Sequence, residues 1–214
     1  MNALQTLAQA AGIAYAAGLN LYATVAVIGL TARFNLIGPL PGSLNALTSW
    51  WVIGISLTLM LIEFVASLIP AVASIWDTLH SLVRPPVAAV LAAATAWHGD
   101  PAFVLVAALI GGGLAVTTHT TKLGLRYAID ASPEPVTNGI TSVAELGLVS
   151  MIAINLWEHP FWTLGFALVV LGLLIAMVRL IWRTLQQVFS GRWAPRRFLQ
   201  DARTSDRLGR REDD

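Results

Sequence analysis

Ionisable side chains recur at helical spacing in two stretches of the sequence that are otherwise apolar. Both stretches place them at positions i, i+3 and i+7, which a helix brings to one face. They are Asp77, His80 and Arg84 within residues 70–84, and His119, Lys122 and Arg126 within residues 118–131, with Asp130 extending the second row. Because the residues between them are apolar, we expect interfacial or re-entrant helices whose charges face the protein. Ordinary solvated loops are the alternative.

Two further carboxylates lie deeper in apolar sequence. At 1.5 Å per residue, Glu63 lies about 10 Å before Pro70, and Glu145 lies about 18 Å after Pro133. An ionisable group at membrane depth normally faces a partner, a bundle interior or water. We therefore predict a functional polar pathway through these carboxylates. A structural role, such as an ion pair of Glu63 with Arg84, is the alternative.

The sequence Ser132-Pro133-Glu134-Pro135 predicts a helix start, with Ser132 as the cap and proline at the first helical position. In that helix Glu134, Asn138 and Glu145 share a face. Such a helix N-terminus near His119, Lys122 and Arg126 would attract an anion. Proline also follows the first polar stretch, in Arg84-Pro85-Pro86, so the two stretches resemble related units.

These positions divide by the chemistry of their side chains. Those expected to bind an anionic substrate are Arg84, Lys122, Arg126, His80, His119, Ser132 and Asn138. Those expected to couple protons or ions are Glu63, Asp77, Asp130, Glu134 and Glu145. We expect no cofactor, metal site or catalytic residue, since the chain has no cysteine and no HExxH, GxSxG or P-loop signature.

The elements that position these residues are membrane helices. Apolar residues make up 56% of the 214 residues and charged residues 12%, against about 25% in an ordinary soluble domain. Eight of the 13 basic residues follow Ile181, which leaves few charges to cover the rest of the chain. The composition therefore predicts a polytopic membrane protein, and the net charge of +1 gives no indication of nucleic-acid binding.

Segments of about 20 apolar residues and proline punctuation predict an all-α bundle of about six transmembrane helices, with two proline-broken polar hairpins that could be re-entrant. The expected helices are residues 10–32, 50–69, 85–98, 101–117, 132–157 and 161–178. Residues 1–185 are the expected membrane domain. Residues 186–214 are expected to form a disordered cytoplasmic tail, rich in arginine.

The positive-inside rule places this tail in the cytoplasm, and six crossings would place the N-terminus there too. Arg33, Asp100 and Glu158 then fall outside. The tryptophans agree, with an outer belt of Trp50, Trp51, Trp97, Trp157 and Trp162 and an inner group of Trp76, Trp182 and Trp193. The expected partners are the lipid bilayer and an anionic lipid or phosphorylated small molecule, with a homo-oligomer possible and no nucleic acid.

Several separated motifs within residues 10–157 resemble an uncharacterised bacterial membrane family, domain of unknown function 4126. They are Gly18-Leu19-Asn20-Leu21-Tyr22-Ala23-Thr24, Glu63-Phe64-Val65-Ala66, Ile69-Pro70, Trp76-Asp77, His80, Arg84-Pro85-Pro86, Lys122, Arg126, Ser132-Pro133-Glu134-Pro135 and Asn138. The resemblance implies an integral protein of the bacterial inner membrane. It supplies no reaction, substrate or catalytic residue.

The function predicted from these features is a small permease or lipid-translocating protein for an anionic or phosphorylated substrate. Broken helices whose ends meet at charged groups are how many transporters build their binding sites. An intramembrane hydrolase or phosphotransferase, with Asp77, His80 and His119 as acid–base or metal groups, is one alternative. A non-catalytic assembly subunit that uses the tail as its contact is another.

Overall fold

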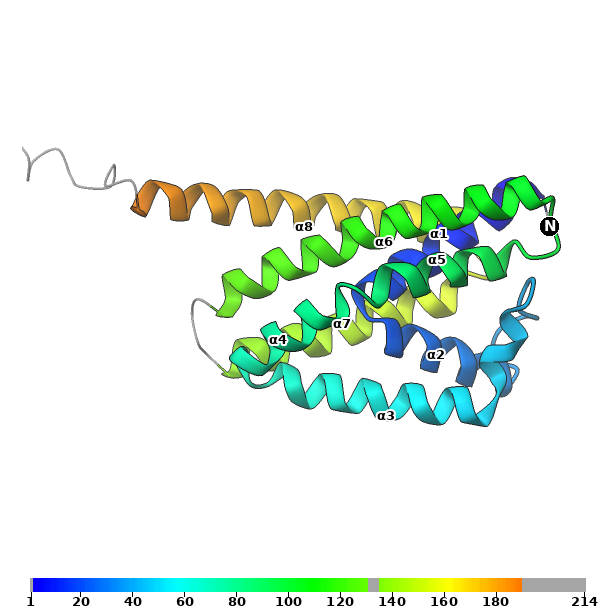
Figure 1. Ribbon diagram of the computed structural model, residues 1–214, viewed down its shortest axis with the longest axis horizontal. Coiled ribbons are helices and arrows are strands. Elements are labelled where there is room, and N and C mark those ends of the chain that lie inside the picture. Colours follow the sequence, from blue (N-terminus) through cyan, green and yellow to red (C-terminus); the bar gives the residue numbers. More distant parts are fainter. Residues whose placement is uncertain (1, 131–134, 190–214) are drawn as a thin grey trace, which may run out of the picture. The chain divides into compact units, whose positions relative to one another are not determined.

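The computed structural model describes residues 2–130 and 135–189, and it confirms an all-α fold (Figure 1). The described helices are α1 (Ala3–Leu19), α2 (Leu21–Arg33), the short 3-10 helix η1 (Leu44–Thr48), α3 (Trp50–Ser67), α4 (Pro70–His80), α5 (Arg84–Thr95), α6 (Pro101–Asp130), α7 (Pro135–Asn155) and α8 (Pro160–Phe189). The chain divides into two units, Met1–Ile175 and Ala176–Asp214. The charged residues of interest all lie in the first unit.

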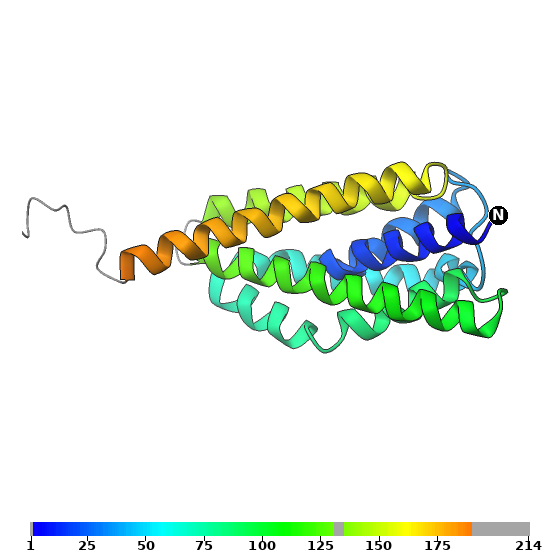
Figure 2. The ribbon, with the colours of Figure 1, turned by 90° about the horizontal axis from the view of Figure 1, so that it is seen from above.

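Helices α1 and α2 form a hairpin that turns at Asn20. The backbone of Asn20 is extended, with φ −145° and ψ 101°, and its side chain accepts a hydrogen bond from the Ala23 N–H at 2.9 Å, which caps α2. The two helices run in opposite directions from this turn (Figures 1 and 2). The prediction of one helix over residues 10–32 is therefore wrong, because the Asn20 side chain replaces the helical hydrogen bonds that the chain gives up there.

The outer ends of this hairpin lie at the same end of the first unit. Ala3 and Thr6 at the start of α1 line a cavity together with His98 and Asp100 of the α5–α6 connection. At the close of α2, the Arg33 guanidinium lies 5.0 Å from the Trp50 ring centroid at the start of α3. The hairpin thus enters and leaves on one side, like a re-entrant loop.

This geometry corrects the predicted topology. An N-terminus in the cytoplasm and Asp100 outside cannot both hold, because the start of α1 lies beside Asp100. The count of six crossings, which put the N-terminus in the cytoplasm, included the α1–α2 segment as one crossing. The start of α1 therefore lies at the same end of the first unit as Asp100.

Three helices are long and apolar enough to cross a membrane, which indicates a multi-pass membrane protein. They are Trp50–Ser67, Pro101–Tyr127 and Pro160–Gln186. The predicted helix over residues 50–69 is confirmed, with its end set by Pro70, which begins α4. The other described helices are either too short or not apolar enough to be counted among these three.

The two polar stretches differ in how they join the preceding helix, and the proline break predicted after the second stretch lies outside the described residues. The first is broken: α4 ends at His80 and α5 begins at Arg84, whose next residues are two prolines that lack N–H donors. The second is continuous, since residues 118–130 are the last turns of α6. No proline interrupts α6 after Pro101, so its hydrogen-bond ladder continues through the polar row.

Helix α1 is the centre of the packing and is buried from Ala8 to Leu19. Small side chains allow α5 and α6 to approach it closely. A methyl group added to Gly18 would lie 2.9 Å from the Cα of Ala115 on α6, and one added to Gly111 would lie 3.1 Å from the Cβ of Ala14. Because α1 is packed between its neighbours, the turn at Asn20 is buried inside the first unit.

Candidate functional site

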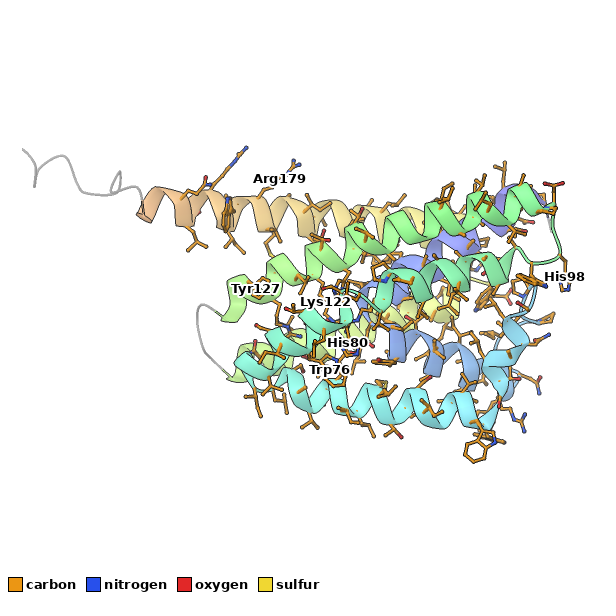
Figure 3. All side chains as sticks on the ribbon, viewed as in Figure 1. Trp76, His80, His98, Lys122, Tyr127 and Arg179 are labelled. Carbon is orange, nitrogen blue, oxygen red and sulfur yellow. The ribbon has the colours of Figure 1, made fainter. Side chains whose placement is uncertain are left out.

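Six ionisable side chains from α3, α4, α5, α6 and α7 meet beside the turn of the α1–α2 hairpin. We call them the charged cluster: Glu63, Asp77, Arg84, Lys122, Arg126 and Glu145. When all six are ionised, three negative charges balance three positive ones. Figure 3 shows Lys122 among the helices, in contrast to His98 at the end where α1 begins.

Glu63 and Arg84 form the shortest ion pair in the cluster. Arg84 Nη2 donates to Glu63 Oε1 at 2.5 Å, and the Arg84 side chain is fully buried. Arg84 Nη1 also donates to the carbonyl oxygen of Leu19 at 3.1 Å. The structural alternative predicted for Glu63, an ion pair with Arg84, is therefore present.

Lys122 lies in a cage of oxygen atoms. Its Nζ donates to the Leu19 carbonyl at 2.9 Å, to Glu145 Oε1 at 2.7 Å and to Glu63 Oε1 at 3.2 Å, and it lies 3.5 Å from Asp77 Oδ1. Leu19 is the last residue of α1, where helix carbonyls carry partial negative charge. The break at Asn20 thus supplies a backbone ligand for two cations, as the interrupted helices of transporters do.

Asp77 connects α4 to the cations of α5 and α6. Its Oδ1 lies 3.2 Å from Arg84 Nη2, and its Oδ2 lies 3.4 Å from Arg126 Nε. Burial alone would raise the pKa of Asp77, but the positive charges of Lys122, Arg84 and Arg126 outweigh it and hold that pKa below its usual value. Asp77 is therefore a carboxylate at neutral pH.

Asn20 joins the hairpin turn to both deep carboxylates. While its Oδ1 caps α2, its Nδ2 donates to Glu63 Oε1 at 3.2 Å and to Glu145 Oε1 at 3.1 Å. The Asn20 side chain thus caps α2 and also hydrogen-bonds to the carboxylates of Glu63 on α3 and Glu145 on α7. Any movement of Glu145 changes a hydrogen bond of the residue that fixes the turn.

His119 bridges Ser81 and Arg84. Its Nδ1 lies 3.3 Å from Arg84 Nη1, and its Nε2 lies 2.9 Å from Ser81 Oγ. A guanidinium only donates, so Nδ1 accepts and the proton of the neutral ring is on Nε2. In that tautomer His119 donates to the serine, so it cannot remove the hydroxyl proton as the base of a hydrolase would.

His80 lies apart from the charged cluster. Its Nδ1 lies 2.7 Å from the Trp76 carbonyl oxygen and its Nε2 lies 2.8 Å from the Tyr22 hydroxyl, while its ring stacks on Trp76 with centroids 4.4 Å apart. His80 lies on the same continuous helix α4 as Asp77, but its ring nitrogens face Tyr22 and the Trp76 carbonyl instead of the cluster. The row predicted from spacing therefore divides, with Asp77 and Arg84 in the cluster and His80 beside α2.

Two cavities lie next to each other at the cluster. The large cavity, of about 170 Å³, is lined by Lys122, Arg126 and Glu145 and by apolar side chains of α6, α7 and α8. The small cavity, of about 10 Å³, has room for about one water. Arg126 and Glu145 line both cavities, so they separate the large apolar space from the polar interior.

Buried polar atoms of the cluster have unused hydrogen-bonding capacity. Glu63 Oε2 and Arg126 Nη1 are buried without a hydrogen-bond partner among the described residues, and both side chains line the small cavity. Ser67 and Ser142, whose hydroxyls are 2.7 Å apart, line it as well.

Of the remaining predicted residues, the structure describes the side chain of Asn138 alone. Asn138 is fully buried on α7, and neither of its amide atoms has a partner among the described side chains and backbone groups. Ser132 and Glu134 lie outside the described residues, and Asp130 is described only as the end of α6. In the described ranges, no group of three or more His, Cys, Asp or Glu side chains is arranged to hold a metal ion.

Sequence reasoning missed two contributors. The Leu19 carbonyl has no side-chain signal, and the only indication was the Gly18–Asn20 sequence that breaks the helix. Ser81 gave no signal either, because its role depends on the loop between α4 and α5 bringing it to His119. Both groups lie at breaks between helices, where the spacing of residues along the sequence no longer predicts which way a side chain or a carbonyl group points.

The comparisons with known proteins give one match. The family model described as Domain of unknown function (DUF4126) matches residues 7–180, which include the charged cluster and both cavities. No curated protein and no solved structure matches the chain.

Proposed function

This chain belongs to the DUF4126 family, which assigns it no activity, and from its own charged cluster we propose that it is a proton-coupled permease or lipid-translocating protein for an anionic or phosphorylated substrate. The observation that carries the proposal is a buried, charge-balanced cluster built at helix breaks and bordered by a cavity. The bacterial inner membrane is the proposed location, with the arginine-rich tail in the cytoplasm.

Charge balance couples the substrate to protons. The six ionised groups sum to zero, so a bound anion leaves a net negative charge in a site where uncompensated charge is costly. Protonation of one cluster carboxylate for each negative charge of the substrate restores neutrality. The substrate and the proton therefore enter and leave the site together.

Glu145 is the carboxylate best placed to take the proton. Its side chain is 12% exposed, against 6% for Glu63 and 3% for Asp77, and it lines the large cavity. Lys122 is its only ion-pair partner among the described residues, whereas Glu63 and Asp77 each contact at least two cations. A protonated Glu145 would free one N–H of Lys122 for the substrate anion, while Lys122 keeps its contacts with Glu63 and the Leu19 carbonyl.

The helix breaks provide the elements that can move. Both the α1–α2 turn and the α4–α5 break contact the cluster, through Leu19 and Asn20 in the first case and Ser81 and Arg84 in the second. Residues at the ends of helices can absorb backbone changes without breaking a continuous hydrogen-bond ladder. We propose that the release of Lys122 from Glu145 loosens the hairpin turn through Asn20.

The test uses purified protein in phosphatidylcholine vesicles that enclose a pH-sensitive dye. Two probes are added outside in separate experiments, inorganic phosphate and a fluorescent phosphatidic acid. We expect acidification of the vesicle interior that depends on at least one probe and on the protein. Glu145→Gln should abolish it, because glutamine cannot exchange a proton.

Glu158→Gln, outside the charged cluster, is the matched control and should behave like wild type. The proposal fails if neither probe produces acidification above that of protein-free vesicles. It also fails if Glu145→Gln retains the wild-type rate while its melting temperature stays close to wild type.

A further inference from the structure

The large cavity combines an apolar wall with charged side chains at one part of its lining. Its walls include Leu125 of α6, Leu148 of α7 and Leu174 of α8, and its charged residues are Lys122, Arg126 and Glu145. The volume of about 170 Å³ is below the 300–1,000 Å³ typical of pockets for drug-sized ligands. A space of this size and polarity fits a slender apolar chain with one charged end.

The charged end must be an anion. Arg126 is 4% exposed, uses its Nε on Asp77, and has no hydrogen-bond partner for Nη1 among the described residues. Glu145, the only carboxylate of the lining, is already compensated by Lys122 at 2.7 Å and by Asn20 at 3.1 Å. A ligand cation would therefore meet two positive charges and no free carboxylate, whereas an anion finds the unpartnered Nη1 of Arg126.

We propose that this cavity binds a single-chain anionic amphiphile, whose phosphate or carboxylate head group is held by Arg126 and Lys122 while its chain lies against Leu125, Leu148 and Leu174. This inference rests on the proposed function, since it names the substrate class of the same site. Arg126 donates to such a head group through its unpartnered Nη1, while Lys122, whose Nζ already contacts Leu19, Glu63 and Glu145, attracts the anion by its charge. The membrane is the solvent in which an amphiphile of this kind dissolves.

Binding is tested by isothermal titration of the full chain in a neutral detergent, with no membrane or gradient. The titrants are decyl phosphate, decanol and inorganic phosphate, each used separately. We expect saturable binding of decyl phosphate and none of the other two in the same concentration range. Equal binding of decanol would show an apolar site with no head-group selectivity, and equal binding of inorganic phosphate would show an anion site with no chain; either result overturns the proposal.

Two variants test the two parts of the site separately. Arg126→Gln should raise the Kd for decyl phosphate at least about tenfold, because a charge-assisted hydrogen bond is lost. Ala144→Phe should do the same by filling the cavity that Ala144 lines. Val143→Phe is the matched control, because Val143 is 60% exposed and does not line the cavity, and its Kd should equal that of wild type.

The outcome is independent of the transport experiment. Binding of decyl phosphate without proton-coupled flux would contradict the proposed function and leave this site in place. Flux driven by inorganic phosphate without binding of decyl phosphate would contradict the amphiphile and leave the permease in place. If Arg126→Gln does not fold, Ala144→Phe against Val143→Phe decides, and unchanged binding by Ala144→Phe overturns the assignment to this cavity.

Discussion

The Glu63 carboxylate and the Arg84 guanidinium, on α3 and α5, are 2.5 Å apart, and neither side chain is more than 6% exposed. Arg84 cannot lose its charge, and Glu63 also pairs with Lys122, so removal of Glu63 takes a carboxylate from two buried cations and leaves Arg84 with Asp77 at 3.2 Å. Glu145 forms its ion pair with Lys122, which retains Glu63 and the Leu19 carbonyl if Glu145 changes. The sequence gives no reason to distinguish Glu63 from Glu145, but the structure indicates that loss of Glu63 destabilises the protein more than loss of Glu145.

Glu63→Gln should destabilise the protein by about 3–5 kcal/mol, the usual cost of breaking a buried pair. Glu145→Gln should cost about 1–3 kcal/mol, because the new amide side chain could still hydrogen-bond and Lys122 keeps other acceptors. Thermal or denaturant unfolding in detergent measures both. Equal losses for the two variants would contradict the different roles.

Asn20→Asp and Asn20→Ser separate the helix cap from the charged cluster. Aspartate and serine both cap helices well, so the start of α2 is retained in each variant. Aspartate also places a negative charge against Glu63 and Glu145, whose oxygens lie 3.2 Å and 3.1 Å from the present amide nitrogen. We expect Asn20→Asp to be the less stable at neutral pH, with the difference shrinking as the pH falls. Identical melting curves would show that Asn20 acts only as a cap.

Gly18→Ala should destabilise the protein by about 1–3 kcal/mol, because the new methyl group would lie 2.9 Å from backbone atoms of Ala115. Gly113→Ala is the control on α6, since nothing lies within 4 Å of the added carbon. It should be neutral or stabilising by up to about 1 kcal/mol, because alanine favours the helix. Melting temperatures of the two variants check the close approach of α1 to α6.

The hairpin topology is tested with single cysteines in a chain that has none of its own. Cysteines at Asn2, Ser43 and Glu158 should react with a membrane-impermeant reagent added outside cells, and one at Ser205 should react only after the membrane is opened. Labelling of Asn2 is the deciding result, because one helix over residues 10–32 would place it on the opposite side from Ser43. A protected Asn2 would contradict the α1–α2 hairpin.

Asp77 should make the stability of the protein depend on pH in the acid range. Its pKa in the folded protein lies below the usual value of about 3.9, so the stabilisation is present above that pH and is lost as the pH falls through the folded-state pKa. Asp77→Asn should be less stable than wild type at pH 7, and the difference should shrink below about pH 4. A difference that stays constant down to the lowest pH would contradict an ionised Asp77.

The sequence by itself indicated a membrane protein, an all-α fold and the positions of several helix boundaries. Apolar segments of membrane length identified α3 and α8, and the predicted helix start at Pro101 is the first residue of α6. Spacing also predicted that His119, Lys122 and Arg126 share a face. That prediction is confirmed, because α6 is continuous through all three and all three contact the cluster.

Only the tertiary structure decided which charges pair and where the chain turns back. Residues 10–32 contain no charged residue, and the turn at Asn20 exists because its side chain caps α2 while Arg84 and Lys122 bind the freed Leu19 carbonyl from other helices. His80 likewise contacts Tyr22 of α2 and not Arg84, although it lies on α4 together with Asp77. Helical periodicity fixes directions only along an unbroken hydrogen-bond ladder, so at each break the direction depends on partners that are distant in the sequence.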